Sequence, residues 1–129
     1  MKQEHKELLL RDLCARLPYG VKCKYYDCCE GDYYEGTICG IEPKEYIQIN
    51  GVCIYIEEVK LYLLPMSSMT EEEREDYQKI RMIDWVDGDI NGTFINAGLI
   101  VDWLNAHHFD YRGLIEKGLA IDATGLNIY

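Results

Sequence analysis

Apolar residues near the start of the chain recur at three- and four-residue intervals, the spacing of one helix face. They are Leu9, Leu10, Leu13, Cys14 and Leu17. Charged residues fill the opposite face: Glu4, Lys6, Glu7, Arg11, Asp12 and Arg16. Pro18 disfavours helical geometry in the residue before it, and Gly20 frees the following turn. The pattern predicts a helix over 1–17.

From residue 20 to about 64 the apolar period changes to two, as in half-buried strands. Val21, Cys23 and Tyr25 alternate with polar residues, and similar runs cover 34–41, 46–49 and 52–56. Asn50-Gly51 separates the last two runs and suits a tight hairpin turn. Residues 57–65 read as a fifth short strand or a helical turn. We expect a bent antiparallel meander of four or five strands, for which a small SH3-like barrel is one arrangement.

The rest of the chain is predicted to be mainly helical. Thr70 and the three glutamates after it form a capping box, and the helix continues to about Met82. Residues 84–96 read as a loop, and 97–108 as a second helix with a further helical turn between Gly113 and Gly118. The sequence therefore predicts an α+β fold in one domain, 1–129. Its parts are a helix over 1–17, an antiparallel sheet over 20–64 and a helical part over 70–118.

The charge distribution limits the kinds of partner that the protein is expected to bind. The net charge is −10, with +3 on residues 1–24, −7 on 27–58 and −6 on 59–129. Such a field repels nucleic acid, so direct nucleic-acid binding is not expected. No window approaches the ~18 continuous apolar residues of a membrane span, so we expect no membrane partner. The N-terminus lacks an export signal, which favours a cytoplasmic location and six reduced cysteines.

Two segments carry a resemblance to a known family: LLLRDLCARLPYGVK near the start and DWLNAHHFDYRGLIEKGLAIDATGLNIY at the end. They resemble a family of small uncharacterised proteins from gut Bacteroidales bacteria and their phages. The resemblance covers both ends and only loosely the centre. The family has no assigned activity, so the resemblance implies a bacterial cytoplasmic setting, on a mobile element, and no site residues.

One motif resembles part of a calcium-binding loop. Asp87, Asp89, Asn91 and Gly92 match positions one, three, five and six of an EF-hand loop, whose oxygen ligands suit a hard cation. The twelfth position is Gly98 in place of the bidentate glutamate. Because two ligands are lost, we favour a turn stabilised by its own side chains, and we expect no cofactor.

Thiol and imidazole groups offer an alternative, enzymatic interpretation. Cys28 and Cys29 lie among four acids, which raise the pKa of a thiol. His107 extends the apolar stripe of its helix and should be packed, whereas His108 should face solvent at the helix end. A metal-dependent or thiol enzyme would use His107, His108 or the cysteines.

Tyrosine is unusually frequent, with eleven in the chain. Strand alternation places four of them on the face opposite the core: Tyr26, Tyr33, Tyr46 and Tyr55. Either a C-terminal helix covers this face, for example through Trp103, or the face is open and binds a protein partner. We expect a small interaction or regulatory module. The alternatives are the enzyme above and an acidic decoy that mimics nucleic acid. The oligomeric state stays open.

Overall fold

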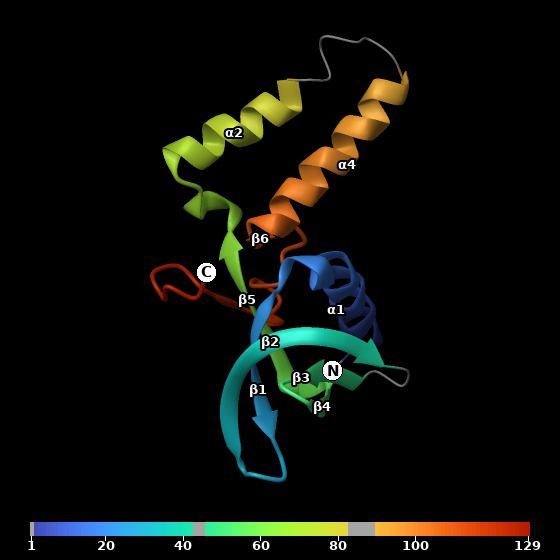
Figure 1. Cartoon of the computed structure of the whole chain (residues 1–129), viewed down its shortest axis with the longest axis vertical. Coiled ribbons are helices and arrows are strands. Elements are labelled where there is room, and N and C mark those ends of the chain that lie inside the picture. Colours follow the sequence, from blue (N-terminus) through green and yellow to red (C-terminus); the bar gives the residue numbers. More distant parts are fainter. Residues whose placement is uncertain (1, 43–45, 83–89) are drawn as a thin grey trace.

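The computed structural model describes residues 2–42, 46–82 and 90–129, and its fold is α+β (Figure 1). The helices are α1 (Gln3–Arg16), α2 (Glu71–Met82) and α4 (Ile90–Ala106), with short 3-10 turns η1 (Leu17–Tyr19), η2 (Ile56–Glu58) and η3 (Met66–Ser68). The strands are β1 (Lys22–Asp27), β2 (Asp32–Glu42), β3 (Tyr46–Ile49), β4 (Val52–Tyr55), β5 (Val59–Pro65), β6 (Phe109–Asp110) and β7 (Ala120–Asp122).

The predicted N-terminal helix and antiparallel meander are confirmed. Strands β1 to β4 pair in sequence order, and β5 returns to pair antiparallel with β1. Asn50 and Gly51 form the expected tight turn, with positive φ angles of 51° and 81°. The segment after β4 contains both of the predicted alternatives, the 3-10 turn η2 followed by β5. The sheet is open, running β4-β3-β2-β1-β5-β6, so the described strands form no closed barrel.

Two short strands from the C-terminal part make the sheet mixed, whereas we expected only antiparallel pairing. Both β6 and β7 run parallel to β5, with Leu64 opposite Phe109 and Leu61 opposite Ala120. Strand β6 lies inside the segment predicted to be helical. Strands of two and three residues are too short to show an alternating pattern. Their pairing also depends on β5, which is about fifty residues away in the sequence.

Strand β2 bends strongly around the core, as the cyan arc in Figure 1 shows. Its register with β3 shifts between Ile38 and Gly40, which marks an irregularity of the β-bulge type. At Gly36 the backbone passes very close to the β3–β4 turn. A Cβ there would lie 2.7 Å from Cγ2 of Ile49 and even nearer to the Asn50 amide. Only glycine leaves room for this approach.

The main core lies between α1 and the inner face of the sheet. The strand residues predicted to point inward are buried there: Val21, Cys23, Tyr25, Ile38, Ile47, Ile49, Ile54 and Ile56. The inner face of α1 differs from the prediction. Cys14 is exposed, whereas Asp12 and Arg16, assigned to the polar face, are fully buried beside Leu9 and Leu13.

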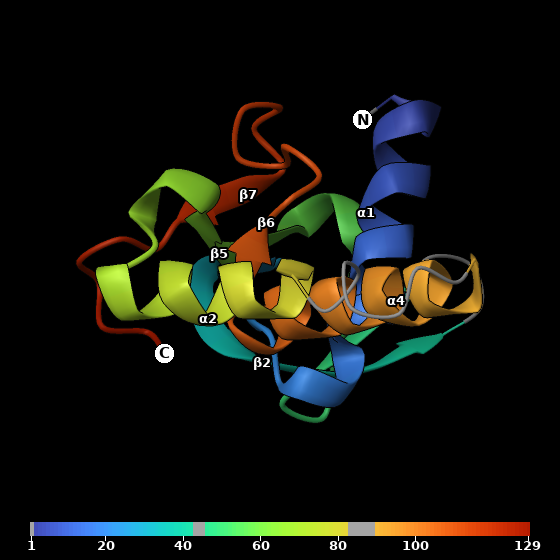
Figure 2. The same ribbon diagram turned by 90° about the horizontal axis from the view of Figure 1, so that it is seen from above.

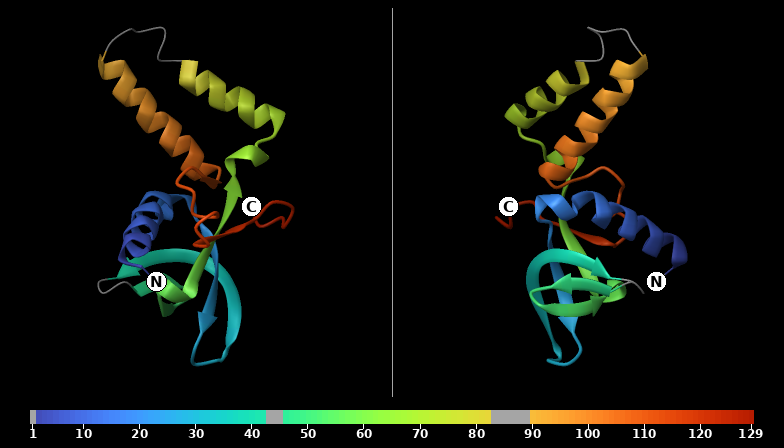
Figure 3. Two further views of the ribbon diagram at one scale, coloured as in Figure 1. Left: turned by 180° about the vertical axis from the view of Figure 1, so that it is seen from behind. Right: turned by 45° about the vertical axis from the view of Figure 1, so that its right-hand side comes forward.

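A helical arm formed by α2 and α4 lies at the β6 end of the sheet and does not extend over strands β1–β4 (Figures 1 and 3). Thr70 caps α2 as predicted, since its backbone N–H donates to Glu73 and the Glu73 N–H donates to its hydroxyl. The described part of α4 begins at Ile90, so our assignment of 90–96 to a loop was wrong. The two helices contact each other, and seen from above they lie almost in one line across the molecule (Figure 2).

A second, smaller core closes the base of this arm. Met69, Leu104 and Phe109 are buried there, and the Trp103 ring stacks on the Phe109 ring at 5.7 Å. Trp103 therefore packs within the arm and does not cover the tyrosines of the sheet. Among the described helices, none has the length and apolar character needed to cross a membrane.

Candidate binding surface on the outer face of the sheet

The outer face of β2, β1 and β5 carries aromatic and charged side chains in aligned rows. The strand registers place Tyr33 opposite Tyr26, Glu35 opposite Lys24, and Lys24 opposite Lys60. These residues alternate with the buried positions Cys23, Tyr25, Val59 and Leu61. We use the term outer face for the side of β1, β2 and β5 that carries Tyr26, Tyr33, Lys24 and Lys60.

Tyr26 and Tyr33 form a cross-strand pair on the outer face. Their ring centroids lie 5.1 Å apart, and the Tyr33 side chain is 62% exposed whereas Tyr26 is half-buried. The ammonium of Lys24 lies 5.1 Å from the Tyr33 ring centroid, within the range of a cation–π contact. The pair therefore presents a large aromatic surface that is held in place from two sides.

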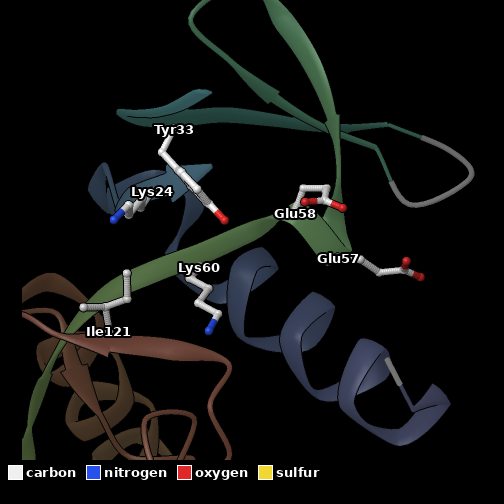
Figure 4. A pocket seen from close by; sticks show the side chains of 6 residues that line it. All are labelled: Lys24, Tyr33, Glu57, Glu58, Lys60 and Ile121. Atoms are coloured by element: carbon white, nitrogen blue, oxygen red, sulfur yellow. The ribbon is translucent and has the colours of Figure 1, made fainter. Parts of the chain in front are cut away.

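A pocket of about 150 Å³ opens beside Tyr33. Its lining combines one aromatic ring, two cations, two carboxylates and one apolar side chain: Tyr33, Lys24, Lys60, Glu57, Glu58 and Ile121 (Figure 4). In Figure 4 the Tyr33 ring extends into the space between the other side chains, and Glu57 turns away toward α1. The pocket joins five elements, because β1, β2 and β5 supply Lys24, Tyr33 and Lys60, η2 supplies the glutamates and β7 supplies Ile121.

A second hollow of about 270 Å³ lies on the neighbouring rows of β1, β2 and β5. Its lining includes Lys22, Glu35, Tyr62 and Ile128. The Tyr62 hydroxyl donates to Glu35 over 2.8 Å, and burial followed by this bond raises the pKa of Tyr62 to about 12. The C-terminal tail borders this hollow, since the Lys22 ammonium donates to the Ile128 carbonyl over 2.9 Å.

Tyr46 and Tyr55 form a separate pair on β3 and β4. Their rings lie 4.6 Å apart, and the Tyr46 hydroxyl donates to the Tyr55 hydroxyl over 2.9 Å. This bond raises the pKa of Tyr46. Tyr55 is 56% exposed and Tyr46 half-buried. The four predicted tyrosines thus lie in two cross-strand pairs, and Tyr33 of the first pair lines the pocket of about 150 Å³.

The two histidines are packed in different ways. Nδ1 of His107 lies 2.8 Å from the Trp103 carbonyl, and its ring stacks on the Trp103 indole, as expected for a packed residue. His108 was predicted to face solvent, and that prediction was wrong. Its ring stacks on the Tyr129 ring at 3.5 Å, and burial together with the nearby Arg16 lowers its pKa to about 4. A neutral, stacked imidazole is poorly placed to act as a surface cation.

The cysteines are free thiols, and Cys23 alone among the six is buried. Burial raises the pKa of Cys23 to about 12. Ligand atoms of Asp27, Cys28 and Cys29 lie within 4.8 Å of one another in the β1–β2 turn. The neighbouring Cys28 and then Asp27 raise the pKa of Cys29, so this thiol is less nucleophilic than usual.

Asp87 and Asp89, from the partial EF-hand motif, lie outside the described residues. Asn91 lies in the first turn of α4, and its side chain is not among those described. The cation site remains a prediction.

Sequence analysis missed a buried polar network that joins α1 to the turn after β6. The Asp12 carboxylate accepts from Nε of Arg16 over 2.7 Å and from Nε of Arg112 over 3.2 Å. Arg16 also donates to the Phe109 carbonyl over 2.6 Å. In the sequence, Asp12 and Arg16 are spaced i,i+4 at the edge of the apolar stripe. The same spacing is common in ion pairs on exposed helix faces, so it did not indicate burial.

Comparison with models of protein families found no match, and comparisons with curated proteins and with solved structures found none either.

Proposed function

We propose that this protein is a binding module that docks a protein partner on its outer face. The observation that carries the proposal is the exposure of Tyr33, which is 62% exposed although its ring contacts Tyr26 and Lys24. A rigid, exposed aromatic side chain at the mouth of a pocket has the character of an interface hot spot. The Tyr46–Tyr55 pair is a secondary contact region in this proposal.

The position of the helical arm supports the proposal. A helix packed over the tyrosines would have explained them as a second core layer. The arm instead lies at the β6 end of the sheet, and Tyr33 and Tyr55 stay exposed (Figure 3). Exposed apolar patches of this kind are typical of surfaces that bind another protein.

We further propose that the meander is an opened variant of the SH3-like barrel. Its strand order β4-β3-β2-β1-β5 and the 3-10 turn between β4 and β5 support this relation. A cytoplasmic setting on a bacterial mobile element is likewise part of the proposal. It is supported by the six free thiols and by the resemblance of the two end segments.

The experiment is site-specific photo-crosslinking with benzoylphenylalanine in place of single tyrosines, in cells that naturally encode the protein. Position 33 should give a discrete cross-linked adduct. Position 34 is the matched control, because Tyr34 is the adjacent residue, is 41% exposed and belongs to the opposite face. Tyr33→Ala should then weaken binding of the identified partner at least tenfold, since hot-spot residues contribute about 2 kcal/mol or more. Adducts of equal yield from positions 33 and 34 would contradict the proposal.

A further inference from the structure

The pocket beside Tyr33 contains two lysines that oppose each other. Lys24 on β1 and Lys60 on β5 are direct partners in the antiparallel ladder, and both are exposed. Like charges at directly opposite positions destabilise a strand pair. The chain has 23 acidic against 13 basic residues, so carboxylates are abundant. Among the described residues, however, no ion pair joins a carboxylate to Lys24 or Lys60.

Two of the three carboxylates around the pocket interact with other groups. Glu57 forms an ion pair with Lys6 on α1 at 2.7 Å, and this contact lowers the pKa of Glu57. Glu35, the cross-strand neighbour of Lys24, accepts the hydroxyl of Tyr62. Glu58 alone adds a negative charge at the pocket rim without such a partner in the described residues. The groups that line the pocket without an ion pair in the described residues are thus two ammonium groups and one carboxylate, an excess of one positive charge in a strongly acidic protein.

The size and lining of the pocket limit what it can hold. Its volume of about 150 Å³ equals roughly five water molecules, the scale of one side chain. Ile121 supplies an apolar wall, and Tyr33 supplies a ring face and a hydroxyl donor. A carboxylate on a short aliphatic stem matches both parts of this lining.

We propose that the pocket binds a glutamate or aspartate side chain from an extended acidic segment of the partner, between Lys24 and Lys60 and against Tyr33. The proposal rests on the proposed function, because it names the chemistry recognised at the same surface. The carboxylate relieves the repulsion between the two lysines, so part of the binding free energy comes from a strain that exists in the free protein. Recognition of this kind depends on ionic strength.

The test is a titration of the isotopically labelled full chain with two acetylated peptides, hexaglutamate and hexaserine, followed by amide NMR at low salt. Hexaglutamate should shift the signals of Lys24, Tyr33, Lys60 and Ile121, and hexaserine should leave them unchanged. The double variant K24Q/K60Q should weaken hexaglutamate binding about tenfold, as expected for the loss of two charge contacts. E58Q should strengthen it severalfold, because it removes the opposing charge at the rim. K79Q, on exposed α2, is the matched control and should change nothing.

Three results would overturn the inference. One is an equal response to both peptides, and another is an unchanged affinity in K24Q/K60Q. The third is concentration-dependent self-association lost in K24Q/K60Q, because the acidic start of α2 in a second copy would then be the occupant. If hexaglutamate fails to bind while the cross-link from position 33 persists, the inference fails and the proposed function stands. If the cross-link is also absent, both fail.

Discussion

Removal of the Asp12 carboxylate should be among the most damaging single substitutions in this protein. The side chains of Asp12 and Arg16 have no solvent accessibility, and they pair at 2.7 Å. Arg112, which is 22% exposed, approaches the second carboxylate oxygen at 3.2 Å. The single negative charge of Asp12 thus balances two guanidinium groups, one of which has no access to water.

In Asp12→Ala the Arg16 guanidinium would remain buried with the Phe109 carbonyl as its acceptor. Breaking a buried ion pair by removing one partner costs about 3–5 kcal/mol, because the remaining charge is uncompensated. Domains of this class have a total unfolding free energy of about 5–15 kcal/mol, so the loss is a large fraction of it. With an unfolding entropy of about 2.1 cal/mol/K per residue, the expected decrease in Tm is about 11–18 °C.

Urea unfolding followed by circular dichroism measures this cost. Glu7→Gln, on the exposed side of the same helix, is the matched control and should change the unfolding free energy by less than about 0.5 kcal/mol. The double variant Asp12→Leu with Arg16→Met should recover at least half of the loss, because apolar residues of similar volume can replace a buried pair. A cost below about 1 kcal/mol for Asp12→Ala would refute the reasoning, since Arg16 would then have to be hydrated.

Four further predictions concern packing and backbone conformation. His108 has a pKa near 4 in the folded state and an ordinary value near 6.5 unfolded, so the unfolded state binds more protons between these values. Stability should therefore fall by up to about 3 kcal/mol as pH decreases from 6.5 to 4, and His108→Gln should remove this part of the pH dependence in urea titrations. Tyr129→Phe should lower the unfolding free energy by about 1 kcal/mol, because two hydrogen bonds of its hydroxyl are lost, and an unchanged value would contradict their role. Gly36→Ala should cost about 1–3 kcal/mol by overlap with the β3–β4 turn. Gly98→Ala, where a Cβ meets open space in α4, should instead stabilise by about 0.5–1 kcal/mol.

Local periodicity was sufficient to predict the meander. The alternation of Val21, Cys23 and Tyr25 fixed the inner face of β1, and the Asn50-Gly51 turn fixed the register of β3 with β4. The inner face of α1 was predicted incorrectly because Asp12 and Arg16 were assigned to solvent on the basis of their charge. Their burial depends on each other and on Arg112, a residue 100 positions away, and no pattern within the helix contains that information.

Of the candidate site, the tyrosines were predictable from the sequence and the pocket was not. Alternation placed the four tyrosines outward, and the hairpin register determines that Tyr26 meets Tyr33. The pocket beside them could not be found from the sequence, since Lys60 and Ile121 come from β5 and β7. Their arrival beside Lys24 depends on the return of β5 to β1, which is a long-range pairing.

The antiparallel pairing of β5 with β1 ends beside the Tyr129 side chain. The β1–β5 ladder extends from Tyr25 opposite Val59 to Cys23 opposite Leu61, and the next pair would be Lys22 with Tyr62. The Tyr129 hydroxyl lies there instead, accepting the Lys22 N–H over 2.8 Å and donating to the Tyr62 carbonyl over 2.7 Å. Both backbone groups keep a partner while the strands separate.

Strand β5 pairs in two directions at once. Leu61 lies opposite Cys23 of β1 on one edge and opposite Ala120 of β7 on the other. On the β7 edge Tyr62 is the register partner of Ile121, which forms the apolar wall of the pocket. Because the Tyr129 hydroxyl binds the Tyr62 carbonyl, a group from the C-terminal tail helps to hold the strand position next to that wall. Tyr129→Phe should therefore perturb the amide signal of Ile121 as well as the stability of the sheet.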